Sequence, residues 1–191
     1  MNQAITIERP WTYERACAEL EETNRPTEIW DGEMIMSPAP SFFHQVIVGR
    51  VEEALRHWVK ARRLGVVASS PLDVVLAPEL VVQPDIVFIS KVRLGIIKQH
   101  ISGAPDLAVE VVSPERRKRD YKLKKERYEQ YGVREYWIVD PQEKLMEIWW
   151  LNEDGFYELT GRFTGKQHAT SKLLPGFKLS VDQIFGDPLK C

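Results

Sequence analysis

The sequence has few cysteines, no long apolar run and no large excess of charge of either sign. Its two cysteines, Cys17 and Cys191, are too few for a framework of structural disulfides. We therefore expect a reducing, cytoplasmic location, and residues 1–11 contain no apolar signal core. No apolar run approaches the roughly 18–20 residues that span a bilayer, so no membrane partner is expected. The formal net charge of −2 excludes a histone-like protein that binds polyanions through bulk charge alone.

Several motifs of common enzyme classes are also missing. The chain contains no Walker-type or Rossmann glycine pattern and no Gly-x-Ser-x-Gly elbow. Its four histidines are scattered and neither cysteine belongs to a Cys-x-x-Cys pair, so a zinc site is not expected. The 191 residues, 43% hydrophobic and 28% charged, suit one globular domain over residues 1–191.

The order of apolar patterns predicts an α/β or α+β fold with a central mixed β-sheet flanked by helices. An N-terminal helix over residues 12–22 precedes a β-hairpin around Asp31-Gly32, a dipeptide that supplies the positive φ angles of a tight turn. A long helix is expected from Ser41 to Gly65, with an apolar stripe of Phe43, Ile47, Val51, Ala54, Leu55 and Trp58. Strands are expected at 66–70, 72–76, 81–90, 107–112, 136–139 and 146–151, with a helical turn at 91–99, a helix ending at Gly132 and a tail at 171–185 that packs back on the domain.

One segment departs from the nearly neutral average. Residues 115–127, ERRKRDYKLKKER, hold eight lysines or arginines against three acids, a local charge of +5. Such a concentration indicates a contact surface for an anionic partner such as DNA, and the alternative is an ordinary solvated helix face. The side chains expected to contact phosphate are Arg116, Arg117, Lys118, Arg119 and Lys122.

Two acids stand in otherwise apolar strands. Asp85 heads one strand, and Glu110 lies in the middle of another. A carboxylate there costs several kcal/mol unless something pairs with it, and two acids on neighbouring strands repel each other unless a cation lies between them. Oxygen ligands of this kind suit Mg²⁺. The alternative places Glu110 on a wet face of the sheet or beside an arginine.

The basic segment offers a partner for these acids. Asp120, Lys124 and Tyr128 recur every four residues and therefore share one helix face. A lysine beside metal-bound carboxylates can orient a water nucleophile and stabilise charge that develops on a phosphate. As the alternative, Lys124 is a solvated helix residue.

Six stretches in order carry a resemblance to a known family: EIWDGEMIMSPAPSFFHQ, PLDVVL, VVQPDIVFIS, GAPDLAVEVVSP, DYKLKKERYEQYGVREYWIVDP and LLPGFKLSVDQIF. Together they resemble a bacterial family described as putative restriction endonucleases, within the PD-(D/E)XK nuclease superfamily. The chain departs from the usual superfamily pattern at Val112, where a lysine would share the strand with the second acid. In the family the lysine lies on the following helix, and Lys124 matches that position.

The resemblance implies a restriction-endonuclease-like core and an endonuclease that hydrolyses DNA phosphodiester bonds with Mg²⁺ or Mn²⁺. It implies that Asp85, Glu110 and the Val111 carbonyl hold the ion and that Lys124 positions the attacking water. Glu28 resembles the family's first acidic position, with an exposed strand residue as the alternative. Residues that could support the site are Gln83, His44, Asp73, Asp120 and Tyr128, of which His44 and Asp73 could equally have structural roles.

Two other functions remain open from the sequence. The missing strand lysine favours a catalytically inactive DNA-binding or assembly module that keeps the nuclease fold. A nuclease that acts on RNA or on branched DNA is the third possibility. Because a double-strand cut needs two sites, we expect an active enzyme to work as a two-fold homodimer.

Overall fold

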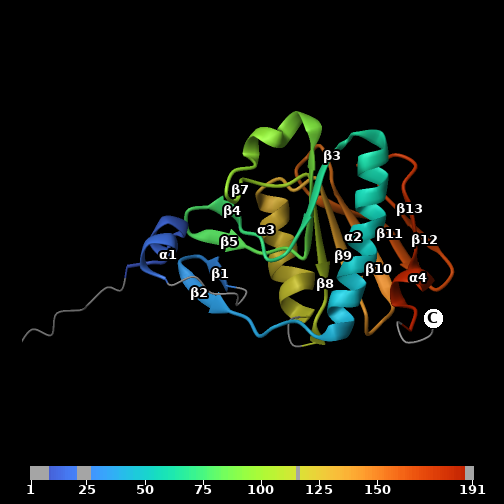
Figure 1. Cartoon of the computed structure of the whole chain (residues 1–191), viewed down its shortest axis with the longest axis horizontal. Helices are drawn as coiled ribbons and strands as arrows, with labels where there is room; N and C mark the ends of the chain where they lie inside the picture. The colour runs from blue at the N-terminus through green and yellow to red at the C-terminus, as the bar shows by residue number, and fades with distance from the viewer. Residues whose placement is uncertain (1–8, 21–26, 115–116, 188–191) are drawn as a thin grey trace, which may run out of the picture.

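A mixed six-stranded β-sheet forms the centre of the computed structural model, which describes residues 9–20, 27–114 and 117–187 (Figure 1). Its strands, in the order β11-β10-β9-β8-β6-β3, are β11 Tyr157–Thr164, β10 Leu145–Leu151, β9 Glu135–Asp140, β8 Leu107–Val111, β6 Ile86–Ser90 and β3 Gly65–Ser69. Strands β8 and β9 run parallel, and the other neighbours run antiparallel. The predicted α+β class with a central mixed sheet is confirmed.

Helix α2, Phe42–Arg62, covers one face of this sheet. Ser41 caps its N-terminus by accepting a hydrogen bond from the His44 amide. The prediction that Gly65 ends the helix is wrong, because Arg63 adopts the left-handed conformation that terminates it. Gly65 instead begins β3, where an added Cβ would lie 2.0 Å from the Ile89 carbonyl oxygen. The predicted burial of Phe43 is also wrong, since it is 57% exposed.

The other face of the sheet packs against a π-helix, η3 Arg119–Lys124, and the helix that continues it, α3 Lys125–Gln130. Alternation along the strands divides the core accordingly. Val109 and Val111 face the α2 side, whereas Ala108 and Val112 face the side that contains Tyr128 of α3. Glu110 therefore lies on the α3 face of β8. The helix expected to end at Gly132 includes the basic segment, and the first two residues of that segment, 115 and 116, lie outside the described part of the chain.

A second sheet has the order β2-β1-β5-β4-β7, with strands β1 Thr27–Trp30, β2 Glu33–Met36, β4 Val74–Ala77, β5 Leu80–Val82 and β7 Ile101–Ser102. The predicted hairpin is confirmed, with Asp31 and Gly32 at φ 51° and 83°. The single strand predicted over 81–90 is wrong: it is two strands, β5 and β6, in different sheets. Residues 83–85 form the corner between them, and this corner carries Asp85.

The remaining elements lie at the ends of the fold. They are α1 Tyr13–Glu19, the 3₁₀ helix η1 Lys91–Ile96, β12 His168–Thr170, β13 Lys178–Ser180 and α4 Val181–Phe185. The tail packs back on the core as predicted, with Leu174, Phe177 and Ile184 buried on the α2 side. Strands β7, β11, β12 and β13 were not anticipated from the sequence. Within the described ranges, no helix combines the length and apolar character needed to cross a membrane.

Candidate active site

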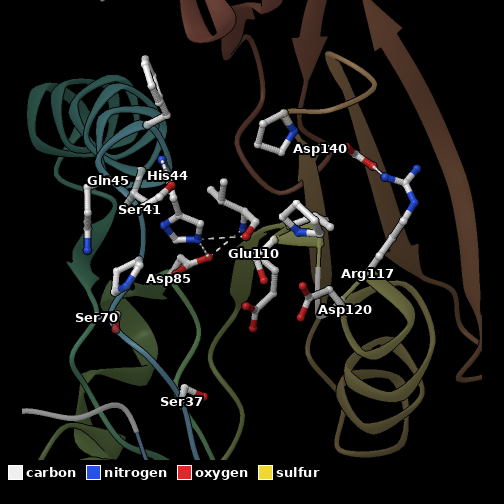
Figure 2. A pocket seen from close by; sticks show the side chains of 18 of the residues that line it. Ser37, Ser41, His44, Gln45, Ser70, Asp85, Glu110, Arg117, Asp120 and Asp140 are labelled. Atoms are coloured by element: carbon white, nitrogen blue, oxygen red, sulfur yellow. Dashed lines mark hydrogen bonds and ion pairs between the residues drawn. The ribbon is translucent and has the colours of Figure 1, made fainter.

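The predicted site residues gather around one cavity of about 720 Å³ between the start of α2, the β5–β6 corner, the end of β8 and the π-helix. Figure 2 shows His44 and Asp85 on one side of this cavity and Asp120 on the other. The predicted residues that line it are Glu28, His44, Gln83, Asp85, Glu110, Val111, Arg117, Asp120 and Lys124. These positions come from β1, α2, the β5–β6 corner, β8 and the helical residues 117–124, so only the folded chain brings them together.

Glu110 and Glu28 hold the ammonium group of Lys124 between them. The Lys124 Nζ donates to Glu110 Oε1 at 2.8 Å and lies 3.2 Å from Glu28 Oε1. The Tyr128 hydroxyl donates to the same Glu110 oxygen at 2.7 Å, and all four side chains are buried. We call Glu28, Glu110 and Lys124 the lysine cluster. Glu110 is thus not on a wet face, and its partners among the described residues are Lys124 and Tyr128 rather than an arginine. Glu28 and Lys124 are buried as well.

Additional contacts fix Glu28 in place. Its Oε1 accepts a hydrogen bond from the Gln83 amide at 2.9 Å, and its Oε2 forms an ion pair with Arg119. The Gln83 side chain in turn donates to Asp73 Oδ1 at 2.7 Å. Gln83 therefore links Asp73, which is not among the residues that line the cavity, to the lysine cluster.

Asp85, His44 and the Val111 main chain form a second group, which we call the imidazole cluster. Asp85 Oδ2 accepts a hydrogen bond from the Val111 amide at 2.7 Å and lies 3.4 Å from His44 Nε2. The same imidazole nitrogen lies 3.0 Å from the Val111 carbonyl oxygen. In Figure 2 the Asp85 carboxylate reaches the His44 ring, whereas the Glu110 side chain turns away from that ring.

The charges in the cavity perturb one another strongly. Burial and the carboxylates of Asp85, Asp120 and Glu28 raise the pKa of Glu110 to about 8, although Lys124 opposes this rise. Burial would raise the pKa of Glu28 as well, but Lys124 and Arg119 outweigh it and leave that pKa below its usual value.

For the two basic side chains, Lys124 and His44, burial has the opposite effect and lowers the pKa. Burial lowers the pKa of Lys124, but the carboxylates of Glu110 and Glu28 outweigh it, so the pKa is raised. The pKa of His44 is also raised, because its contacts with Asp85 outweigh the effect of burial. The site therefore favours its cations in their charged form.

The donor chemistry of the cavity fits a divalent cation. Asp85 and the Val111 carbonyl offer oxygen atoms of the kind that Mg²⁺ and Mn²⁺ bind, and a cation would relieve the repulsion that Glu110 experiences. The two predicted carboxylates nevertheless belong to different clusters. Among the described residues, no three His, Cys, Asp or Glu side chains converge as a preformed metal cage.

Two arginines of the basic segment form ion pairs within the protein. Arg117 forms an ion pair with Asp140 at 2.5 Å, and Arg119 pairs with Glu28 and packs over the Trp30 ring. Both side chains thus have partners within the protein, and their contact with phosphate stays a prediction. Lys118 and Lys122 are exposed, and Arg116 lies outside the described residues.

Asp120 and Tyr128 lie where the four-residue spacing predicted, on the helix face that turns toward the cavity. Both are buried, and the Asp120 carbonyl accepts a hydrogen bond from the Tyr136 hydroxyl at 2.9 Å. Asp140, which also lines the cavity and accepts a hydrogen bond from the Tyr121 hydroxyl at 2.8 Å, was not singled out from the sequence. Its position at the end of a buried strand was the signal for it.

Comparison with known proteins supports a nuclease fold. The family model described as "Uma2: Putative restriction endonuclease" matches residues 11–182. A crystal structure of a putative nuclease belonging to DUF820 from Anabaena variabilis ATCC 29413, at 1.96 Å resolution, is similar with a TM-score of 0.76. The two chains are 20% identical, and the similarity covers 92% of this chain and 98% of that one, which shows the shared fold. No curated protein matches the sequence.

Proposed function

Because the chain belongs to the Uma2 family of putative restriction endonucleases, we propose that it is a metal-dependent endonuclease that hydrolyses DNA phosphodiester bonds. The observation that carries this proposal is the convergence of Asp85, Glu110, Lys124 and Glu28 on one cavity. Buried charged groups of both signs in a cleft are typical of an active site.

We assign the metal ion, Mg²⁺ or Mn²⁺, to Asp85, Glu110 and the Val111 carbonyl. Such an ion polarises a phosphate oxygen and makes water a better nucleophile at neutral pH. Lys124 is held between two carboxylates and stays protonated, so it donates hydrogen bonds to the attacking water or to a phosphate oxygen. Glu28 is a positioning residue that acts through Lys124.

DNA contact is assigned first to the exposed Lys118 and Lys122, which lie beside and on the π-helix that borders the cavity. Arg116, Arg117 and Arg119 remain candidates for phosphate contact. Cleavage of both strands calls for two copies of the cavity, so we propose a two-fold homodimer of single-domain chains acting in the cytoplasm.

A plasmid-nicking assay tests the proposed function directly. The wild-type protein is incubated with supercoiled DNA and Mg²⁺ or Mn²⁺, beside Asp85→Asn and a matched control, Asp182→Asn, at an exposed position of α4. We expect metal-dependent nicking that Asp85→Asn abolishes and Asp182→Asn retains. Equal nicking by all three proteins would remove Asp85 from the mechanism. RNA and branched DNA in parallel reactions identify the preferred substrate class.

A second candidate is a DNA-binding or assembly module without catalysis. It is favoured by Val112 at the usual lysine position and by the engagement of Glu110 with Lys124 and Tyr128. Calorimetry separates the two candidates, because DNA binding without any divalent-ion binding selects the inactive module.

A further inference from the structure

His44 places a ring nitrogen beside two of the three oxygen ligands assigned to the metal ion, those of Asp85 and the Val111 carbonyl. Its place follows from local structure: Ser41 begins α2 and puts His44 in the first turn, and the buried stripe of that helix holds it against the sheet. The Nε2 atom, rather than Nδ1, faces the Asp85 carboxylate and the Val111 carbonyl. The side chains of His44 and Asp85 are partly open to the cavity, with exposed fractions of 13% and 18%.

The distances within the imidazole cluster match those between neighbouring ligands of one ion. Two ligands at right angles, each about 2.1 Å from a metal, lie ~3.0 Å apart, and a tetrahedral angle widens this to ~3.4 Å. The observed separations from His44 Nε2 are 3.0 Å to Val111 and 3.4 Å to Asp85. A cation that displaces the Nε2 proton to solvent can therefore enter this cluster, because His44 Nε2 already lies at ligand-to-ligand distance from both oxygens.

We infer that His44 is itself a ligand of the divalent ion, together with Asp85 and the Val111 carbonyl, and that it makes the site prefer Mn²⁺ to Mg²⁺. This inference rests on the metal-dependent function proposed above. Mg²⁺ favours sites made entirely of oxygen, whereas imidazole nitrogen suits transition metals. Mn²⁺ accepts both kinds of donor, so one histidine beside a carboxylate and a carbonyl shifts the preference toward it.

Mn²⁺ binding to the full-length protein tests this inference without any measurement of cleavage. Pulsed electron paramagnetic resonance detects coupling between bound Mn²⁺ and an imidazole nitrogen, and calorimetry gives the Mn²⁺ and Mg²⁺ affinities. The variant is His44→Gln, and the matched control is His57→Gln, which changes an exposed histidine on the same helix.

We expect nitrogen coupling in the wild type and in His57→Gln, and its loss in His44→Gln. The same variant should bind Mn²⁺ about 10–100-fold more weakly, with a much smaller change for Mg²⁺, so the preference between the two ions collapses. Circular dichroism checks that the variant is folded, and the wild-type spectrum alone remains decisive if it is not.

The outcomes separate this inference from the proposed function. Tight Mn²⁺ binding by the wild type without nitrogen coupling, or unchanged coupling in His44→Gln, overturns the role of His44 and leaves the metal-dependent nuclease intact. If the wild type binds neither ion, both the inference and the metal-dependent function are overturned.

Discussion

Replacement of Lys124 by methionine should strongly destabilise the fold. Methionine keeps most of the side-chain length but removes the ammonium group that contacts Glu110 at 2.8 Å and Glu28 at 3.2 Å. Arg119 still pairs with Glu28, so the main penalty falls on Glu110, which is only 3% exposed. Removal of one partner from a buried ion pair costs about 3–5 kcal/mol when the other partner stays charged. Because the pKa of Glu110 is already raised to about 8, Glu110 takes up a proton instead, and the expected cost falls to about 1–3 kcal/mol. For a domain of this size that corresponds to a melting temperature lower by roughly 2–12 °C.

Urea unfolding, followed by tryptophan fluorescence at pH 7.5 without divalent ions, measures this loss. The matched control is Lys122→Met, which changes an exposed lysine of the same helix and should alter the free energy of unfolding by less than about 0.5 kcal/mol. Glu110→Gln in the Lys124→Met background should recover at least about 1 kcal/mol, because the amide is neutral without having to take up a proton at pH 7.5. If Lys124→Met costs no more than Lys122→Met, the lysine cluster does not hold the charges as described.

Three further predictions concern other parts of the molecule. Burial raises the pKa of Asp106, but the hydrogen bonds from Ser90 outweigh it and leave the pKa below its ordinary value. Asp106 therefore stabilises the fold when the pH is above its unfolded-state pKa of roughly 3.9. Asp106→Asn should lower the free energy of unfolding at pH 7. Acid unfolding should show that this difference between the variant and the wild type becomes smaller below pH 4. Gly65→Ala should cost about 1–3 kcal/mol in urea unfolding, since its Cβ would meet the Ile89 carbonyl, and a neutral result would contradict the close approach. Lys122→Ala should weaken DNA binding and reduce the salt slope of log K by about 1; an unchanged slope in fluorescence anisotropy would exclude it as a phosphate contact.

Sequence patterns predicted the parts of the fold that are determined by residues close together in the sequence. The stripe of α2 recurs at helical spacing because one face packs on the sheet, and Asp31-Gly32 forms its turn because both residues tolerate positive φ angles. The corner at residues 83–85 was missed because apolar residues continue on both sides of it. Only the pairing of β5 with β1 and of β6 with β8 shows that the chain changes sheets there.

The site was predictable where two acids stood in apolar strands, and less so where partners are far apart in sequence. Glu28 and Lys124 are ninety-six positions apart, so neither residue predicts the other without the fold. The same limit applies to Arg119. Its charge suggested a surface role, but Glu28 offers it a buried carboxylate that the sequence could not place beside it.

Strand β8 contributes one residue to each of the two clusters, Glu110 to the lysine cluster and Val111 to the imidazole cluster. The side chain of Glu110 points to the α3 face and meets Lys124, whereas the amide and carbonyl of the next residue, Val111, serve Asp85 and His44. Val112 lies on the same face as Glu110, two positions later, and is buried in the α3-side core. A lysine on the strand at that position would extend over the face that Lys124 now occupies from the helix. The strand and helix positions are therefore alternative routes by which one ammonium group reaches the same carboxylate, and a hydrophobic residue at position 112 is compatible with a complete site.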